Sequence, residues 1–325
     1  MPKSLKAVSP YHHPGFLNFK EGPYHAWEAL GGKVAKAHYP WRFLHGLAYR
    51  WELPTLWKNK KEARLRFVEP VSISFDTFPD YARYEIIPFV WDCWPCHFKK
   101  MCAWLKRHEV RTAIFTSSQT AEKIREWFPK MNVLYCPEGI DTAKYGAGKL
   151  LMKREIDVLE FGRSILRTKT KTITKRDDIN YVCTKEDGKL MFTVEQLVEA
   201  MGDTKVTIAL PRSITNPEVA GDIETLTQRY WECMLSRMVM VGHAPKELVD
   251  LIGYNPVVEV NLDETSYKNK NYDEGIFRRI MEVLEHIEDY QELVDKNRET
   301  ALKMGDWTLR MKQVKEWLRE NGYII

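Results

Sequence analysis

The sequence has 325 residues, of which 44% are apolar, and a formal net charge of +4. Its length allows two domains, each with a substantial core. So mild a net charge would need a basic cluster beside it to argue for nucleic acid binding. The N-terminal residues lack the apolar stretch of a secretory signal, and no apolar run approaches the ~20 residues that span a bilayer. We therefore expect a soluble, cytoplasmic protein that does not bind nucleic acid.

The first half of the chain alternates between strand-like and helix-like stretches. The expected strands are residues 5–11, 71–75, 85–92, 110–118 and 132–139. Helix-like stretches separate them, within 24–40 (interrupted by Gly31-Gly32 and leading into a second strand), within 41–67 (which ends in a basic tail), at 97–108 and at 119–128. Strands and helices that alternate at this spacing predict an α/β fold, in which helices cover both faces of a parallel sheet.

Ligands of such sheets bind outside the carboxyl ends of the strands. The residues expected there in the first half are His12, His13, Gly15, Asp76, Asp92, Ser117, Ser118, Glu138 and Asp141. Asp76 and Asp92 form the pair of greatest interest, because each lies at a strand end; the alternative is that they cap a helix or turn. For His12 and His13 the alternative is an ordinary solvated loop.

The same alternation starts again after residues 140–155, a stretch without periodicity that we interpret as the domain boundary. Further strands are expected at 156–162, 179–185, 206–212, 238–244 and 255–260, and further helices at 192–202, 274–287, 289–304 and 307–321. The second half therefore predicts a second Rossmann-like unit.

A run of cations follows the strand expected at 156–162. It consists of Arg163, Arg167, Lys169, Lys171, Lys175 and Arg176. One interpretation is a solvated loop. Because the run begins at the carboxyl end of a strand, the other is a site that neutralises a diphosphate leaving group.

Two glutamates, Glu224 and Glu232, lie eight residues apart after the strand at 206–212. If the intervening residues begin a helix, this spacing places both carboxylates on one helix face. Glu224 would then lie at the helix N-terminus, where backbone N–H groups favour a phosphate, and Thr225 and Thr227 would add hydroxyl donors. Such an arrangement suits a nucleotide-sugar site. The alternative is a surface helix whose glutamates face water.

Taken in order, these motifs resemble the GT-B retaining glycosyltransferases of the group 1 type (family 4-like). PEGIDTAKY, at 137–145, resembles the P-x-G-[IV]-D-x-x-x-[FY] segment that ends the family's first domain. DVLEFGR, at 157–163, resembles the strand that ends in Gly-Arg, and Glu224 with Glu232 matches Glu-x7-Glu. VMVGHAPKELVDLI, at 239–252, resembles the strand and loop that follow.

The resemblance implies a GT-B fold of two Rossmann-like domains, whose parallel sheets face each other across a cleft. Residues 1–147 would form the acceptor-binding domain and residues 148–305 the nucleotide-sugar-binding domain. The last helix, in 306–325, would cross back to the first domain. The implied reaction transfers a hexosyl group from a nucleotide-diphosphate sugar, UDP- or GDP-linked, to a glycan or lipid-linked acceptor. It would retain the anomeric configuration and need neither a metal nor another cofactor.

The same resemblance implies roles for matching residues. Arg163 and Lys169 would hold the diphosphate, Glu224 would lie near the donor sugar, and Glu232 would accept hydrogen bonds from the ribose. With Asp92 on the acceptor side, the predicted catalytic residues are Glu224, Arg163, Lys169 and Asp92. The predicted donor-binding residues are Glu232, Thr225, Leu226, Thr227, Lys171, Gly162 and Arg212. The predicted acceptor-side residues are His12, His13, Gly15 and Glu138.

The sequence departs from the family at two positions. Trp91-Asp92 stands where many members have a histidine, and Glu224-Thr225-Leu226-Thr227 replaces a glycine-containing turn. These departures favour an alternative, a non-catalytic nucleotide-binding module of the same fold.

Two further hypotheses come from residues 93–107. Cys93 and Cys96 form a C-x-x-C motif that suits a thiol redox protein if it follows a strand and begins a helix; incidental buried cysteines are the alternative. Basic residues of the same stretch, near two aromatic side chains, suit peripheral membrane contact, with a normal basic surface helix as the alternative. That set comprises Lys99, Lys100, Lys106, Arg107, Phe98 and Trp104.

Overall fold

The computed structural model describes residues 2–8, 21–35, 59–162, 177–186, 189–190, 192–261 and 272–325. It divides into two compact α/β units. Unit 1 comprises Met1–Gly139, Val219–Thr225 and Trp307–Ile325, and unit 2 comprises Ile140–Glu218 and Leu226–Asp306. The sequence placed the first boundary at residue 147 and assigned 219–225 to the second domain. In the structure the chain leaves unit 2 at Val219 and re-enters it at Leu226.

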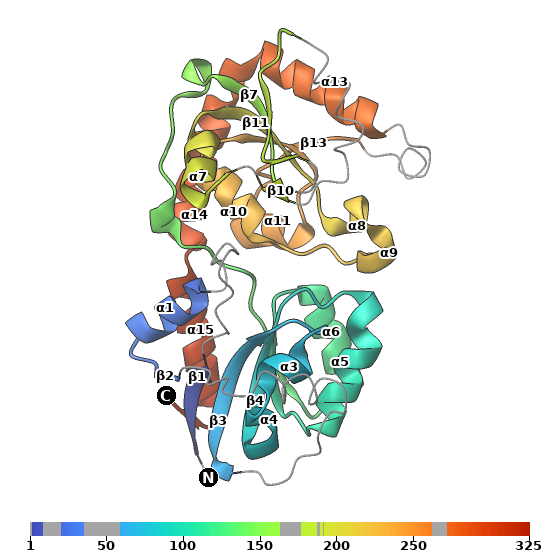
Figure 1. The fold of residues 1–325 in the computed structure, drawn as a ribbon, viewed down its shortest axis with the longest axis vertical. Helices are drawn as coiled ribbons and strands as arrows, with labels where there is room; N and C mark the ends of the chain where they lie inside the picture. The colour runs from blue at the N-terminus through green and yellow to red at the C-terminus, as the bar shows by residue number, and fades with distance from the viewer. Residues whose placement is uncertain are drawn as a thin grey trace. The chain divides into compact units, whose positions relative to one another are not determined.

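Unit 1 is built on a parallel sheet (Figure 1). Its strands are β1 (Lys3–Val8), β2 (Val34–Ala35), β3 (Asn59–Val68), β4 (Tyr84–Val90), β5 (Thr112–Phe115), β6 (Asn132–Tyr135) and β14 (Tyr323–Ile324). Their order is β14-β1-β3-β4-β5-β6, with β2 also paired to β1. The helices are α1 (Gly22–Ala29), α3 (Ile73–Thr77), α4 (Asp80–Arg83), α5 (Pro95–Arg107), α6 (Ser118–Trp127) and α15 (Trp307–Glu320).

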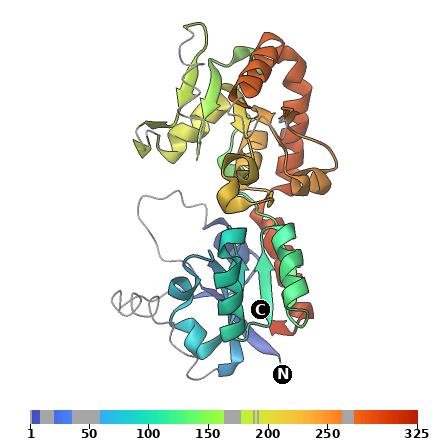
Figure 2. The same cartoon turned by 90° about the vertical axis from the view of Figure 1, so that its right-hand side faces the viewer.

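Both faces of this sheet are buried, as the apolar strands predicted. Ile87 and Phe89 of β4 pack in a core with residues of α1 and α15. Ile86 and Val90 lie on the other face and pack with residues of α5 and α6. Figure 2 shows the ribbons of these two helices beside the sheet of unit 1. Because side chains of a strand alternate between faces, a strand that is apolar throughout requires a helical layer on each side.

Unit 2 has the same construction. Its strands are β7 (Ile156–Glu160), β8 (Tyr181–Cys183), β11 (Thr204–Ala209), β12 (Val239–Gly242) and β13 (Val258–Glu259), which form a parallel sheet in the order β13-β12-β11-β7-β8. A separate antiparallel pair joins β9 (Lys185–Glu186) and β10 (Lys189–Leu190).

The helices of unit 2 cover both faces of its sheet. They are α7 (Val194–Gly202), α8 (Arg212–Thr215), α9 (Pro217–Ala220, which ends in unit 1), α10 (Gln228–Leu235), α11 (Lys246–Ile252), α13 (Tyr272–Glu285) and α14 (Gln291–Met304), with short 3-10 turns η1 (Thr142–Lys144), η2 (Leu151–Lys153) and η5 (Ile287–Tyr290). Residues of α10 and α11 pack on one face, and residues of α13 pack on the other.

Two predictions of local structure in unit 1 are wrong. Residues 71–75, expected as a strand, overlap helix α3, where the Thr77 hydroxyl donates to the Ile73 backbone oxygen (2.6 Å) and the Ser72 hydroxyl donates to Asp76 (2.6 Å). These local hydrogen bonds stabilise a helical turn that the apolar alternation did not reveal.

The second error concerns the basic tail of the expected helix within 41–67, which forms part of strand β3. Residues 41–58 lie outside the described ranges. Ala63 and Leu65 are buried in the core on one face, and on the other Arg64 pairs with Glu62 (2.8 Å) and Arg66 with Asp80 (3.3 Å). Charged residues are not expected in a buried central strand, but the arginines of β3 are accommodated because each pairs with a carboxylate.

Candidate functional site

The carboxyl ends of the unit 2 strands bring four polar or glycine positions to one edge. Gly162 lies after β7, Arg212 after β11 and His243 directly after β12, while Glu259 ends β13. Since β13, β12, β11 and β7 are neighbours in a parallel sheet, these residues lie along a single edge. That edge is where α/β sheets of this type bind ligands.

A cation is fixed beside Gly162 at this edge. Gly162 has φ of +77°, and a Cβ added there would lie 2.1 Å from the Nη2 atom of Arg229. Arg229 belongs to the first turn of α10, and its Cζ lies 5.4 Å from the centroid of the Phe161 ring. The guanidinium therefore occupies the space that the missing side chain leaves. Arg229 was not among the predicted site residues, because nothing in the spacing of the glutamates indicates which intervening residue faces β7.

His243 and Glu259 form a second polar group at the edge. The Nδ1 atom of His243 lies 2.8 Å from Glu259, which also accepts from the backbone N–H of Ala244 (3.0 Å) and from Asn255 (2.7 Å). Burial raises the pKa of Glu259, but hydrogen bonds from His243, Ala244 and Asn255 outweigh it and leave the pKa below its ordinary value. An ionised carboxylate therefore orients the imidazole. This couple was not among the predicted site residues, although His243 lies near the end of the strand expected at 238–244.

Glu232 is held by a residue from a different motif. The Tyr145 hydroxyl, at the end of the PEGIDTAKY segment, donates to Oε1 of Glu232 (3.0 Å). Burial raises the pKa of the half-buried Glu232, while Tyr145 and Arg229 act in the opposite direction. Arg298 in turn donates to the backbone oxygen of Gly146 (3.0 Å), next to Tyr145. Two segments that the sequence suggested separately are thus joined within unit 2.

The prediction that Glu224 and Glu232 project from one helix face is wrong. Helix α10 begins at Gln228, with Thr227 as its N-cap, so Glu224 precedes the helix and belongs to unit 1. The backbone N–H of Glu224 donates to Gln119 (2.8 Å), and that of Leu226 donates to Glu247 (3.0 Å). These side chains satisfy the N–H groups, so an earlier helical turn is not needed to do so.

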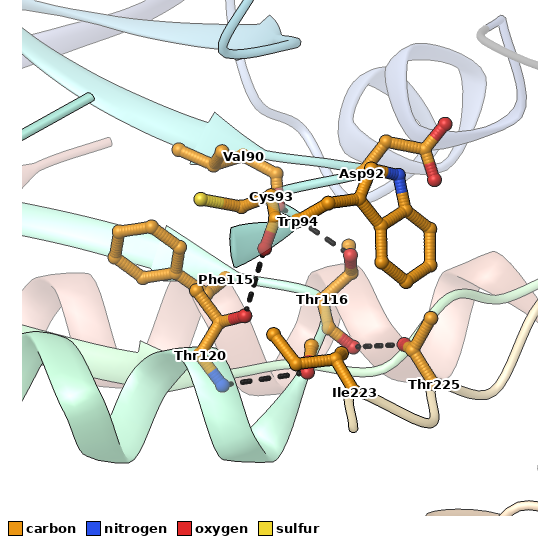
Figure 3. Close-up of a pocket in the computed structure, with 10 residues that line it drawn as sticks. Val90, Asp92, Cys93, Trp94, Phe115, Thr116, Thr120, Ile223 and Thr225 are labelled. Carbon is orange, nitrogen blue, oxygen red and sulfur yellow. Dashed lines mark hydrogen bonds between the residues drawn. The ribbon is translucent and has the colours of Figure 1, made fainter. Parts of the chain in front are cut away.

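The corresponding edge of unit 1 contains a narrow pocket around the ends of β4 and β5 (Figure 3). Its lining consists of Val90, Asp92, Cys93, Trp94, Phe115, Thr116, Ser117, Thr120, Ile223 and Thr225. Its threonine hydroxyls donate to backbone oxygens: Thr116 to Val90 (3.4 Å), Thr120 to Cys93 (3.1 Å) and Thr225 to Thr116 (3.4 Å).

Asp92 is the strained residue of this pocket. Its φ of +50° lies in the left-handed region, which a residue with a Cβ rarely adopts. Its carboxylate points away from Thr116 and Thr225 (Figure 3). Backbone strain of this kind is found at ligand sites more often than elsewhere, and it draws attention to Asp92 on the edge that the sequence predicted.

Comparison with known proteins gives matches in structure only. No family model matches the sequence, and no curated protein matches it. Sucrose-phosphate synthase from Thermosynechococcus elongatus matches with a TM-score of 0.64 at 11% identity, covering 98% of each chain. HepE from Anabaena, solved in complex with UDP and glucose, matches with a TM-score of 0.58 at 10% identity, covering 98% of this chain and 100% of HepE.

AviGT4, a glycosyltransferase involved in avilamycin A biosynthesis, matches with a TM-score of 0.52 at 12% identity, covering 98% of this chain and 97% of AviGT4. TarM also matches with a TM-score of 0.52, at 10% identity, over 80% of this chain, but the match spans only 54% of TarM. The fold is that of the GT-B glycosyltransferases. The two parallel α/β units predicted from the sequence are confirmed.

Several residues of the predicted GT-B site lie outside the described ranges: His12, His13, Gly15, Arg163, Lys169 and Lys171, as does the rest of the cation run. Of the others, Glu138 is buried in unit 1. Asp76 lies within α3 and accepts from Ser72, so it is not at a strand end. Ser117 caps α6 by accepting from Thr120, and Asp141 pairs with Lys144 (3.5 Å). The capping alternative concerned Asp76 and Asp92, and Asp76 lies inside α3, whose N-cap is Ser72.

The C-x-x-C motif has the predicted context, since it follows β4 and begins α5. Cys93 is nevertheless buried, and burial, together with neighbouring Cys102, Cys96 and Asp92, raises the pKa of its thiol. A reactive thiolate needs the opposite environment, so the site does not favour redox chemistry at Cys93. Within the described ranges, no group of three or more His, Cys, Asp or Glu side chains could hold a metal ion.

The aromatic residues proposed for membrane contact are not on the surface. Phe98 and Trp104 are buried in the core between α5 and the sheet, whereas the four cations of that helix are exposed. The apolar face of α5 therefore packs inward, as in an ordinary amphipathic helix. Among the helices that the structure describes, none is long and apolar enough to cross a membrane.

Proposed function

We propose that this protein is a retaining glycosyltransferase that transfers a hexosyl group from a nucleotide-diphosphate sugar, UDP- or GDP-linked, to a glycan or lipid-linked acceptor. The observation that carries the proposal is the cation fixed at the carboxyl edge of the unit 2 sheet. Arg229 lies against Gly162, where the strand ends and the cation run begins. A guanidinium held in place there can bind phosphate oxygens without first losing side-chain freedom.

The other groups on unit 2 suit the rest of a nucleotide diphosphate. Glu259 orients the imidazole of His243, which can then serve as a further donor for phosphate or sugar oxygens. In our proposal Glu232 accepts from the ribose hydroxyls, and the hydrogen bond that it already accepts from the neutral Tyr145 hydroxyl supports this role. Among the similar structures, HepE holds UDP and glucose, which supports this class of donor.

The transfer itself needs positioning and charge stabilisation more than acid–base catalysis by side chains. In our proposal Glu224 acts beside the transferred sugar, and Asp92 lies on the acceptor side. The leaving phosphate, neutralised by Arg229 with Arg163 and Lys169, helps to deprotonate the acceptor hydroxyl on the face from which it departs. Because attack and departure share one face, the anomeric configuration is retained. The reaction as proposed uses neither a metal nor another cofactor.

The test is thermal stabilisation by a panel of UDP, GDP, ADP, CMP and dTDP. A ligand at 100 times its Kd stabilises the native state by about 2.7 kcal/mol, so a specific nucleotide should raise the Tm measurably. Glu232→Ala should abolish that rise, whereas Glu199→Ala, which changes an exposed glutamate of α7, should not. If no nucleotide raises the Tm, the proposal is wrong. NMR of the product formed from the matching donor sugar then tests retention.

A second candidate is a non-catalytic nucleotide-binding module of the same fold. The observation that favours it is the acceptor side, where Asp92 has a φ of +50°. Trp91-Asp92 stands where many members of the family that the sequence resembles have a histidine. Both candidates predict nucleotide binding at unit 2. Turnover separates them, because the module would bind the nucleotide yet leave every donor sugar intact.

A further inference from the structure

Gln119, a residue of α6, forms hydrogen bonds with the backbone on both sides of Ile223. Gln119 donates from Nε2 to the backbone oxygen of Asp222 (3.0 Å), and its Oε1 accepts from the backbone N–H of Glu224 (2.8 Å). A backbone oxygen can only accept and a backbone N–H can only donate, so the two bonds fix the orientation of the amide. The sequence alone does not indicate this contact, because Gln119 lies 105 residues before Glu224.

The segment that Gln119 holds, Val219–Thr225, is part of the unit 1 core. Ala220 and Ile223 are fully buried there, with residues of α5 and α6. Gly221 has φ of +55°, and a Cβ added to it would lie 3.2 Å from Pro95 at the start of α5. Glu224 therefore lies between two anchored neighbours, the buried Ile223 and Thr225.

An ion pair also reaches the segment, but it is a weak one. Lys123 lies 3.6 Å from the Asp222 carboxylate, and the side chain of Asp222 is 77% exposed. Exposed pairs of this kind contribute little to stability. The two hydrogen bonds of Gln119 act on the backbone directly, on both sides of Ile223, and so help to fix the course of the chain at Glu224.

We propose that Gln119 is a positioning residue for Glu224: it fixes the backbone from which this carboxylate reaches the transferred sugar. The inference rests on the proposed function, in which Glu224 acts beside that sugar. Glu224 is placed by unit 1, whereas Glu232 and Arg229 belong to unit 2. Changes at Gln119 should therefore impair turnover without impairing nucleotide binding, a separation that general damage to the fold would not produce.

The experiment compares the full-length wild type with Gln119→Leu, Gln119→Glu and the control Lys123→Ala. Three quantities are measured: hydrogen exchange of the Glu224 amide, the Kd of the nucleotide selected by the panel, and kcat with its donor sugar. Leucine removes both hydrogen bonds, so the Glu224 amide should lose protection and kcat should fall about 10- to 100-fold, as small misplacements of catalytic groups do. The Kd should not change.

The other variants refine the expectation. Gln119→Glu keeps an acceptor for the Glu224 N–H but loses the donor to the Asp222 backbone oxygen. Its kcat should therefore lie between those of the wild type and Gln119→Leu. This variant also tests the inference if Gln119→Leu does not fold. Lys123→Ala should behave as wild type. The inference is overturned if Gln119→Leu keeps its kcat, or if Kd and kcat worsen together. A wild type that binds no nucleotide or turns over no donor sugar would instead remove the proposed function.

Discussion

Gly162→Ala tests whether the cation at the edge of unit 2 binds the donor. The added methyl group would lie 2.1 Å from the Arg229 guanidinium, so the guanidinium must move away from Gly162. Gly253→Ala is a matched control, because Gly253 has a similar φ, +81° against +77°, and a Cβ added to it meets no atom within 4 Å. Both variants incur the same backbone penalty, and only one displaces Arg229.

The expected magnitudes follow from these two contacts. A non-glycine residue in the left-handed region costs about 1–2 kcal/mol, which corresponds to a fall in Tm of about 2–8 °C for a domain of this size class. Both Gly162→Ala and Gly253→Ala should show this fall in Tm. The guanidinium that Gly162→Ala displaces would otherwise make a charge-assisted hydrogen bond worth about 1.5–3 kcal/mol, so nucleotide affinity should fall about 10- to 100-fold. Gly253→Ala should bind as wild type.

Thermal unfolding without ligand measures the fall in Tm. Isothermal titration with the selected nucleotide measures the fall in affinity. Arg229→Ala completes a double-mutant cycle: combined with Gly162→Ala, it should bind no more weakly than Arg229→Ala alone, since both changes remove the same contact. If Gly162→Ala binds the nucleotide as tightly as Gly253→Ala does, Arg229 does not hold the phosphate. If Gly162→Ala is several kcal/mol less stable than Gly253→Ala, the Arg229 guanidinium does not move away to make room for the methyl group.

Three further predictions concern unit 2. Tyr145→Phe removes the hydroxyl that donates to Glu232, so the free energy of unfolding in urea should fall by about 1.5–3 kcal/mol; an unchanged value would show that the pair is not formed. Because burial raises the pKa of Glu232 above its ordinary 4.5, the folded state holds this proton more tightly, and stability should be lost as the pH rises above 4.5 through the folded value. Glu232→Gln should flatten that part of the Tm profile, and an identical slope would contradict the assignment. Arg154→Met leaves the buried backbone oxygens of Thr204 and Ser236 without a donor, so unfolding should become easier by about 2–5 kcal/mol, whereas a loss under about 1 kcal/mol would mean that water replaces the guanidinium.

The fold could be predicted where apolar patterning alone decides the structure. Strands β4, β5 and β12 are buried on both faces, so their sequences are mostly apolar and differ clearly from loops. Strand β3 escaped prediction because Arg64 and Arg66 satisfy their charges through partners that are known only from the fold. Helix α3 escaped it because its V-S-I-S-F sequence alternates as a strand does, while its local hydrogen bonds favour a turn.

The candidate site was predictable only where a motif fixes a residue to the end of a strand. Gly162 lies at the edge for that reason. Arg229 and the His243–Glu259 couple also lie there, but their roles depend on which side chains meet across neighbouring strands and helices. Gln119 is the extreme case, because its partners lie more than 100 residues away in sequence. Contacts of this kind leave no periodicity that a single sequence can show.

The error over Glu224 and Glu232 shows what a spacing motif constrains. Eight residues in one helix advance about 12 Å, whereas four extended residues followed by four helical ones can advance about 19 Å. The same spacing therefore permits two arrangements with different chemistry: two carboxylates on one helix face, or one carboxylate on the helix and one on a separately anchored segment. Here the choice is made by groups outside the motif, since Gln119 and Glu247 take up the N–H groups of Glu224 and Leu226. The backbone partners of a motif, and not its spacing alone, decide which arrangement the chain adopts.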